Sequence, residues 1–501
     1  MRAATRTGLS SRTYRPGGYR ANVAEQQIAV PRRVAAAIAV GTLLNPLNSS
    51  MIAVALVALQ RAFGVGLATS SWLVSGFYLA ACVGQPLMGR VADRYGPRRV
   101  YCAGLAVVLV TGVAALLSPG FGWLVGCRVV QAVGTSAAFP AGLATIRRLA
   151  GGRPPAATLA TISVTNSTSA ALGPVLGGFL VAGAGWRGIF AVNIPLAVVG
   201  LVLALWWLPP DGVRRAPAST DLDLPGVALF SATVVGMLGF LLSLSSGPQW
   251  WLLAVFPVAA GLFTVRELAT TEPFIDLRTL AGHLPLVRAL AQQAGVQLVF
   301  YAIFYSLPLW LERVRGLSAH SAGLLMLPMA ATGVALTPYA AIRVRRSGPR
   351  RALLAGCTAL VGGALSLLLV DDGTPVLGIV GVGIVLGLPQ GFNNIALQAA
   401  VYAGAPEGQT GVAAGLFQTC RYLGAIMSTA LIGVAYGRDY SSGGLHRVAV
   451  FAVGVAVLLA FAAYRTSRTG GARHRSGFSR PRLSGNGTPP GRHRAMPAET
   501  T

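Results

Sequence analysis

Long apolar runs that recur along the chain constrain its fold more than any other feature of the sequence. A helix needs about 20 consecutive apolar residues to cross a bilayer core, and roughly fourteen runs meet this requirement. Their approximate centres are Leu44, Leu79, Val108, Ala132, Leu172, Leu201, Val235, Phe256, Val299, Met329, Leu360, Ile384, Gly424 and Ala456. Because only helices satisfy their own backbone hydrogen bonds in lipid, we predict an all-α polytopic membrane protein. Little more than Ser245–Trp250 separates the runs between 235 and 265, which leaves the count of that pair open.

The distribution of arginine supports this interpretation and predicts the topology. All 40 basic residues are arginine, and against 14 acidic residues they give a net charge of +26, which by itself suggests a nucleic-acid partner. When the gaps between runs alternate from a cytoplasmic amino terminus, 32 arginines fall inside and six outside, while Arg128 and Arg421 lie within helices. This asymmetry is the positive-inside pattern of membrane proteins. It accounts for the charge without a nucleic acid and predicts that both termini are cytoplasmic.

An internal repeat divides the chain. Gly96-Pro97-Arg98-Arg99 recurs 252 residues later as Gly348-Pro349-Arg350-Arg351, and eight apolar runs lie in that interval where two six-helix halves would give six. We therefore predict a cytoplasmic tail over 1–33, a six-helix half over 34–210, two extra helices with their flanking loops over 211–280, a second six-helix half over 281–464, and a disordered, arginine-rich cytoplasmic tail over 465–501.

The loop after the second run carries the most specific motif. It reads Gly89-Arg90-Val91-Ala92-Asp93-Arg94-Tyr95-Gly96-Pro97-Arg98-Arg99. Further motifs follow as Arg128-Val129-Val130-Gln131, Gly173-Pro174-Val175-Leu176-Gly177-Gly178, Trp186-Arg187-Gly188-Ile189-Phe190 and Asn193-Ile194-Pro195. The loop resembles the G-x-x-x-D-R-x-G-[RP]-[RK]-[RK] signature of the major facilitator superfamily. The later motifs match it in the expected order. With about fourteen helices, the chain is similar to the fourteen-helix drug:proton antiporters of that superfamily, which include multidrug and antibiotic-resistance exporters.

The resemblance implies a major facilitator fold, with two six-helix halves plus two linking helices, and a conformational latch in the first loop. The latch residues are Gly89, Asp93, Arg94, Gly96 and Arg98. They are expected to close the cytoplasmic side when the cavity opens outward. The second copy of the loop has Arg345 where the first has Asp93, so only the first half should carry the full latch. A charged loop that merely fixes topology is the alternative.

The glycine and proline residues of the fifth run form the hinge that the resemblance assigns to antiporters. Gly173, Gly177 and Gly178 lie on one side of a helix and permit close approach of a neighbour, while Pro174 removes a backbone hydrogen bond. A packing seam of small residues is the alternative interpretation.

The first run departs from the family pattern at the position of its proton site. The fourteen-helix family reads L-D-x-T-I-V-N-V-A-L-P, whereas this chain has Asn48 where the family has aspartate, with Asn45 one turn earlier. An amide does not titrate in the accessible range. Arg128 is the most informative residue nearby, because a cation at mid-membrane costs roughly 2.5–3.5 kcal/mol and is seldom kept without a use. We expect Arg128 to face the cavity beside Gln131; bonding to carbonyls of a neighbouring helix is the alternative.

The same departure bears on the cargo. None of the 14 acidic residues lies centrally in a predicted helix, and Glu312 comes nearest. A cavity with Arg128 and Arg421 but no carboxylate disfavours cations, so we expect a neutral or anionic small molecule. Two polar stripes with a four-residue period are further candidates for binding it: Gln293, Gln297, Tyr301 and Tyr305, then Gln390, Asn394 and Gln398. Hydrogen bonding between helices is about equally consistent with these residues.

Other functional classes find no support in the residues. Without lysine the chain has no G-x-x-x-x-G-K-[ST] loop, and its five cysteines and five histidines show no spacing for a metal or a catalytic triad. We therefore expect no enzyme activity, no cofactor and no metal.

The sequence favours a secondary exporter of a small amphipathic molecule in a bacterial cytoplasmic membrane, exchanging it for protons in contact with membrane lipid. A facilitator or importer of the same fold, or a membrane scaffold or sensor that does not transport, stays open.

Overall fold

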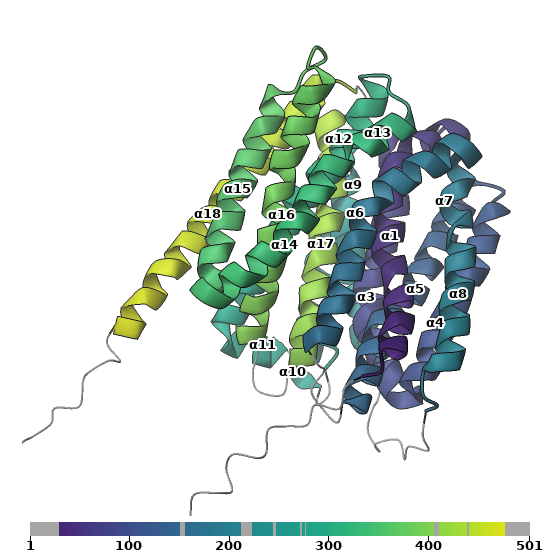
Figure 1. Ribbon diagram of the computed structural model, residues 1–501, viewed down its shortest axis with the longest axis vertical. Coiled ribbons are helices and arrows are strands. Elements are labelled where there is room, and N and C mark those ends of the chain that lie inside the picture. The colour runs from purple at the N-terminus through teal and green to yellow at the C-terminus, as the bar shows by residue number, and fades with distance from the viewer. Residues whose placement is uncertain are drawn as a thin grey trace, which may run out of the picture.

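The computed structural model describes residues 30–150, 156–211, 223–243, 247–270, 273–275, 277–404, 410–437 and 440–475. Within these ranges every regular element is a helix, and the long helices stand side by side in one bundle (Figure 1). The amino-terminal group, purple to blue in Figure 1, comprises α1 (Arg32–Phe63), α2 (Leu67–Ser70), α3 (Trp72–Tyr95), α4 (Pro97–Leu116), α5 (Phe121–Leu149), α6 (Ala156–Ala184), η1 (Gly185–Arg187), α7 (Gly188–Ala191) and α8 (Asn193–Trp207).

Two helices follow before the second group begins: α9 (Leu224–Ser243) and α10 (Trp250–Ala269). The carboxyl-terminal group comprises α11 (Leu277–Gly282), α12 (Leu284–Arg313), α13 (Ala319–Leu325), α14 (Leu327–Ser347), α15 (Pro349–Ser366), η2 (Leu367–Leu369), α16 (Val376–Gly404), α17 (Thr410–Tyr436) and α18 (Ser442–Arg475). Helix α18 includes residues 465–475, which the sequence places in the tail, while the other residues of that tail and 1–29 lie outside the described ranges.

The predicted all-α membrane fold is confirmed in its broad form. Twelve helical segments of the described residues are long and apolar enough to cross a membrane, so the predicted count of fourteen is not confirmed. One of the 12 segments, Val164–Trp207, runs from within α6 through η1 and α7 to the end of α8, so it covers two long helices. Helix α17 has 27 residues and is not among the 12 segments.

The two groups pack their helices in matching patterns. Helix α1 packs on α6 as α12 packs on α17, and α5 packs on α3 and α4 as α16 packs on α14 and α15. Contacts between the groups match too, because α3 lies on α17 and α6 lies on α14, while α1 meets α12. The α9–α10 pair lies against α3 and α17 through α9. The repeat in the sequence therefore corresponds to a repeated packing arrangement.

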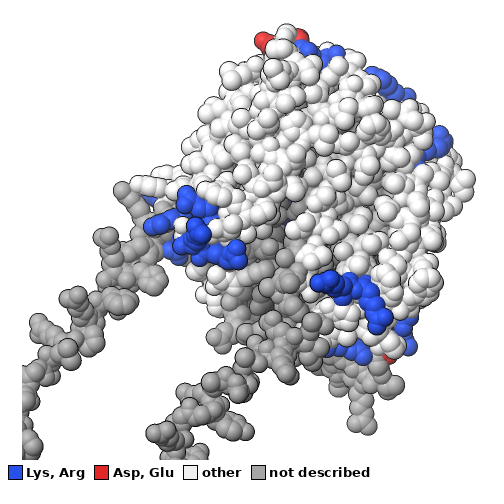
Figure 2. Space-filling model, in the orientation of Figure 1, with Lys and Arg blue, Asp and Glu red and all other residues white. Residues whose placement is uncertain are grey.

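Charge is concentrated at the two ends of the bundle. Figure 2 shows basic side chains on both sides of the lower end and others near the top, with a broad uncharged belt between them. Large apolar side chains of the long helices are exposed, among them Val110, Trp206, Leu262 and Leu458. An exposed apolar belt between two polar ends is what a lipid bilayer requires of a spanning protein.

Candidate functional site

The centre of the bundle holds a buried polar network built around Arg128 of α5. Its side chain is 2% exposed, and its guanidinium carbon lies 4.3 Å from the centre of the Phe77 ring. Nη1 donates to Gln131 Oε1 at 3.0 Å and to Asn48 Oδ1 at 3.4 Å, and Nη2 donates to the Asn48 carbonyl at 3.4 Å. Gln131 is close because it lies one turn along the same helix. The structure therefore joins three sequence-predicted site residues in one cluster.

The orientation of the Asn48 amide is fixed by a chain of hydrogen bonds. Its Nδ2 donates to Asn193 Oδ1 at 2.6 Å, and Asn193 Nδ2 donates to the carbonyl of Ile189 at 3.0 Å. With its nitrogen committed to α8, Asn48 presents its oxygen to Arg128. Asn193 is a residue that the sequence flags only as part of a motif, since nothing local indicates that it supports helix α1.

A second branch of the network crosses from one group of helices to the other. Asn45 Nδ2 donates to Thr135 Oγ1 at 3.2 Å, and Asn45 Oδ1 accepts from the Tyr422 hydroxyl of α17 at 3.3 Å. Tyr422 in turn accepts from Gln85 Nε2 of α3 at 2.9 Å. The sequence predicts Asn45 but misses Gln85 and Tyr422, although an amide in an apolar helix is a detectable signal.

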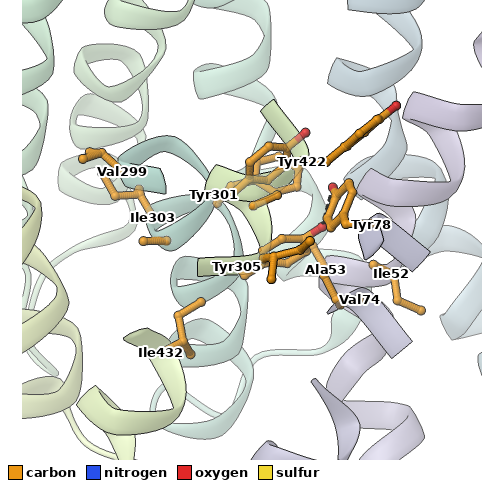
Figure 3. Close-up of a cluster of buried hydrophobic side chains, with 14 of the residues drawn as sticks. Ile52, Ala53, Val74, Tyr78, Val299, Tyr301, Ile303, Tyr305, Tyr422 and Ile432 are labelled. Atoms are coloured by element: carbon orange, nitrogen blue, oxygen red, sulfur yellow. Dashed lines mark hydrogen bonds between the residues drawn. The ribbon is translucent and has the colours of Figure 1, made fainter. Parts of the chain in front are cut away.

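Four tyrosines, Tyr78, Tyr301, Tyr305 and Tyr422, lie close together in the bundle, as Figure 3 shows. Tyr78 of α3 lies with its ring centre 5.4 Å from that of Tyr301 and 5.6 Å from that of Tyr422. Its hydroxyl bonds that of Tyr305 at 2.9 Å, and Tyr305 donates to the Ser49 carbonyl of α1 at 3.0 Å. The cluster thus has members from both groups, and aromatic contacts tie the groups together at mid-bundle.

The second intrahelical arginine lies on the other side of the tyrosines. Nε and Nη2 of Arg421 in α17 both donate to the Tyr301 hydroxyl, each at 3.3 Å. The two arginines that the sequence singled out therefore approach the tyrosines from opposite groups of helices. Arg128 does so through its neighbours on α1 and α3, and Arg421 bonds Tyr301 directly.

The predicted polar stripes are only partly joined to this centre. Tyr301 and Tyr305 belong to it, whereas Gln293 and Gln297 are buried nearer the start of α12, and Gln297 lies against Gly424 of α17. In α16, the half-buried Gln390 lies against Gly333 of α14, Gln398 Nε2 donates to the Tyr402 hydroxyl at 3.4 Å, and Asn394 is half-buried between them in sequence.

The signature loop joins α3 to α4 through a left-handed glycine. Gly96 has a φ of 101°, and Asp93 and Arg94 are exposed in the last turn of α3. The carboxylate of Asp211 accepts the backbone N–H groups of Arg98 at 3.1 Å and Arg99 at 3.0 Å, where the α4 amino terminus favours negative charge. Asp211, which follows α8, is a functional candidate that the sequence misses, because no motif marks it.

The same loop reaches two other segments. Arg98 Nη2 donates to the Leu205 carbonyl of α8 at 2.6 Å, and Arg90 donates to the Pro273 carbonyl in the segment between α10 and α11. Gly89, the first residue of the signature, lies close enough to α5 that a Cβ atom would sit 3.7 Å from Pro140. The loop therefore contacts the α10–α11 connection as well as its own group.

The Gly-Pro stretch of α6 lies between α1 and α13. A Cβ atom at Gly177 would lie 2.9 Å from the Met51 carbonyl oxygen, and one at Gly178 would lie 2.6 Å from the Ala319 carbonyl oxygen. A Cβ atom at Gly173 would collide with Ser50 of α1, and one at Gly323 of α13 would lie 2.5 Å from the Pro174 carbonyl oxygen. The close approach of neighbours thus involves helices of both groups.

At the end of the bundle where α1 finishes, Gln60 joins both groups. Its Nε2 donates to Ser70 Oγ at 2.9 Å, and its Oε1 accepts from Arg313 Nη2 at 2.7 Å and from the Tyr440 hydroxyl at 3.4 Å. Glu312 is buried in the same region, and its Oε1 has no hydrogen-bond partner among the described residues.

The helical bundle, its lipid-facing belt and its central polar network define the class of protein as a membrane transporter of small molecules. A family model described as "Major Facilitator Superfamily" matches residues 38–429. The chain therefore belongs to the major facilitator superfamily, whose members are generally not enzymes. Membership of its fourteen-helix drug:proton antiporter branch is a narrower statement than this match supports.

Curated relatives include proteins named for export and resistance. The chain is 37% identical over 413 residues to the uncharacterized MFS-type transporter YwoD of Bacillus subtilis, covering 81% of this chain and 90% of that protein. It is 30% identical to the tetracenomycin C resistance and export protein of Streptomyces glaucescens, covering 79% and 74%. It is 28% identical to the multidrug resistance protein Stp of Mycobacterium tuberculosis, also covering 79% and 74%.

Solved structures share the fold. The xylose transporter XylE from Escherichia coli, in a partially occluded inward-open conformation, superposes with a TM-score of 0.59 at 14% identity, covering 88% of this chain and 99% of that one. The overlap extends over nearly all of the solved chain, so the bundle is of the major facilitator type.

Proposed function

We propose that this protein is a secondary active exporter that moves a small amphipathic drug or secondary metabolite out across the bacterial cytoplasmic membrane in exchange for protons. The observation that carries the proposal is the buried network shared by the two groups of helices, in which Tyr78 bonds Tyr305 and Asn45 bonds Tyr422. Alternating access needs a central site whose two sides belong to parts that move relative to each other. The relatives named for export and resistance support the outward direction.

We also propose the fourteen-helix architecture, with both termini cytoplasmic. The support is that Val164–Trp207 contains the separate helices α6 and α8, and that α17 packs between α12 and α3 inside the bundle. The matching packing of the two groups supports six-helix halves at 34–210 and 281–464, with α9 and α10 in the intervening 211–280.

The cargo of this proposed exporter is neutral or anionic. Two arginines lie at the central network, and the buried carboxylates of the described residues, Asp223, Glu267 and Glu312, have no hydrogen bond to it. Because Asn48 does not titrate, the proton that enters in exchange for the cargo passes through Glu312, or else the membrane potential alone drives the export of an anionic cargo. The Asp93 loop acts as the latch, and the Gly173–Gly178 stretch as the hinge.

Uptake into everted membrane vesicles tests the proposal. With an imposed inside-acid gradient, neutral and carboxylate antibiotics are expected to accumulate, lipophilic cations are not, and a protonophore abolishes accumulation. Glu312→Gln in the same vesicles separates the two ways of coupling, since it stops uptake driven by the proton gradient only where Glu312 carries the proton. Downhill movement that ignores the protonophore establishes a facilitator instead, and no movement of any of these compounds contradicts export.

A further inference from the structure

The positive charge of Arg128 is buried without a carboxylate among its described contacts. Every acceptor that contacts its guanidinium is neutral: the Asn48 side-chain and backbone oxygens and Gln131 Oε1, with the Phe77 ring stacked on the cation. Two of these three hydrogen bonds are long, at 3.4 Å. A buried cation that lacks a counter-ion is costly, so its surroundings favour a negative charge.

Two donors at this place have no acceptor among the residues that the structure describes. Arg128 Nε and Gln131 Nε2 are buried without a hydrogen-bond partner there, and the two side chains are 2% and 1% exposed. They lie one turn apart on α5, where residues of that spacing face the same way. Gln131 already gives its oxygen to Arg128 Nη1, and this bond leaves its amide nitrogen as the unused group. Buried N–H groups without acceptors are rare, so this pair is a candidate for an absent ligand.

Asn48 keeps this charge available. Its Nδ2 is committed to Asn193, so its neutral oxygen, and not a second donor, is presented to Arg128. A carboxylate at the same position would form an internal ion pair and compensate the guanidinium.

We propose that Arg128 and Gln131 form a binding site for a monovalent anion. Because Asn48 is neutral, it does not act as a counter-ion for Arg128 and leaves the positive charge to the ligand. The ligand chemistry is an oxyanion or halide that accepts N–H bonds from both side chains. It reaches this site either as the carboxylate, sulfonate or phenolate of an acidic cargo, or as inorganic chloride. Tyr78 and Tyr305 line the adjoining region, so an acidic group carried on an aromatic ring suits it.

The part of this proposal that concerns cargo rests on the proposed export function, whereas the anion site itself does not. Equilibrium binding in the absence of any gradient separates the two. The full-length protein in lipid nanodiscs is titrated with radiolabelled 2-naphthoate and with its neutral isostere, radiolabelled 2-naphthamide. The buffer contains neither nitrate nor gluconate. A parallel titration adds sodium chloride as a competitor.

The decisive variant is Asn48→Asp, which keeps the size of the side chain, adds a negative charge and loses the hydrogen bond that Asn48 Nδ2 donates to Asn193 Oδ1. It is expected to weaken naphthoate binding at pH 7.5 by about tenfold or more, as for a lost charge-assisted hydrogen bond. Naphthamide binding is expected to stay within about twofold. Asn48→Ser is the matched control, because it removes the same amide without adding charge, and it should keep the preference for naphthoate over naphthamide. Retained naphthamide binding and a cooperative thermal unfolding transition show that each variant is folded.

Each result has a meaning. Selective loss of naphthoate binding in Asn48→Asp, with competition by chloride in the wild type, supports the site and its use by acidic cargo. If the wild type binds chloride but not naphthoate, and Asn48→Asp removes the chloride binding, the anion site is supported and its assignment to cargo is overturned. Equal binding of both naphthalene probes by wild type and Asn48→Asp, or no anion binding at all, overturns the proposal. Proton-driven export that fails in vesicles while the anion binds overturns the proposed function alone.

Discussion

The two Gly-Pro-Arg-Arg loops have the same local structure and different surroundings. Gly96 and Gly348 both take a positive φ, 101° and 78°, and each donates its N–H to the carbonyl four residues earlier, Ala92 and Val344. In the first loop the next helix is capped by Asp211, and a Cβ atom on Gly96 would overlap that carboxylate. In the second loop a Cβ atom on Gly348 would meet nothing within 4 Å among the described residues. A sequence repeat therefore reproduces a turn without reproducing its tertiary role.

The largest expected effect comes from replacing the two glycines. Gly96→Ala combines an unfavourable φ with displacement of Asp211, so we expect it to lower the free energy of unfolding by about 3 kcal/mol. Gly348→Ala adds only the backbone strain, about 1 kcal/mol. Thermal unfolding of both variants in the same detergent measures the difference. Equal losses would show that the surroundings of the two loops do not matter.

The acidic residue of the first loop provides the next test. If Asp93 is the latch, Asp93→Asn is expected to reduce the transport rate about tenfold by shifting the equilibrium between the two open states. Arg345→Ala, at the corresponding position of the second loop, should stay within about twofold of the wild type. Initial rates of uptake into everted vesicles, normalised to the amount of protein, give the comparison. A loss of the same size in both variants would contradict a latch that is confined to the first loop.

Removing the cap should have a smaller effect than replacing Gly96. Asp211→Asn retains an acceptor for the N–H groups of Arg98 and Arg99 but removes the negative charge at the start of α4, so we expect a loss of about 1 kcal/mol. The distant pair of Asp211 with Arg148, 3.8 Å apart and half exposed on the arginine side, contributes little, so Arg148→Gln is the control. Chemical or thermal unfolding measures the free energy of unfolding of both variants. A larger loss in the control would assign the stabilisation to the ion pair instead.

The smallest effect is expected near the segment between α10 and α11, which Arg90 of the first loop contacts. The second loop has no matching arginine, because Ile342 stands at the position that corresponds to Arg90. Arg266 pairs with Asp223 at 2.9 Å, and the backbone N–H of Ile275 donates to Glu267, next to Arg266, at 2.8 Å. Burial raises the pKa of Asp223, but the Gly226 N–H and the Arg266 guanidinium outweigh burial, so this pKa lies below its usual range.

A lowered pKa gives the sign of the pH dependence. The stabilisation by Asp223 is fully present above its unfolded pKa of about 3.9 and is lost as the pH falls through the lower folded pKa. Asp223→Asn should therefore cost less than about 1 kcal/mol at pH 7, because the arginine is partly exposed. The difference in unfolding midpoint between Asp223→Asn and the wild type should narrow only below about pH 4. Unfolding midpoints from pH 3 to pH 8 test this, and a gap that narrows near pH 6 would assign the effect to another group.

Much of the central site is recognisable in the sequence, because burying polar residues in an apolar helix is costly and they stand out. Asn45, Asn48, Arg128 and Gln131 fall into this class, and the structure brings them together with Tyr301 and Arg421. The stripe of α16 was recognisable by the same rule but lies toward α14, because helical periodicity gives a face and not the neighbour that covers it.

The residues that the sequence missed have their importance from long-range contacts. Tyr422 bonds Asn45 across 377 positions, Tyr78 bonds the predicted Tyr305 across 227, and Asp211 caps a helix more than 100 residues away. A tyrosine in a membrane helix is ordinary composition until its partner is known, and an acid after a helix is ordinary loop chemistry.

The sequence by itself determined the helical membrane fold, its superfamily motifs, the repeat and the substitution of an amide for the family's helix-one carboxylate. These are local properties, since apolar length, turn-forming glycine and side-chain chemistry act within one or two turns. Only the tertiary structure decided that Asn48 offers its oxygen to Arg128, that Asp211 caps the helix after the first loop, and which helices cover each polar face. Those outcomes depend on contacts between distant segments, which the packing of the whole bundle selects.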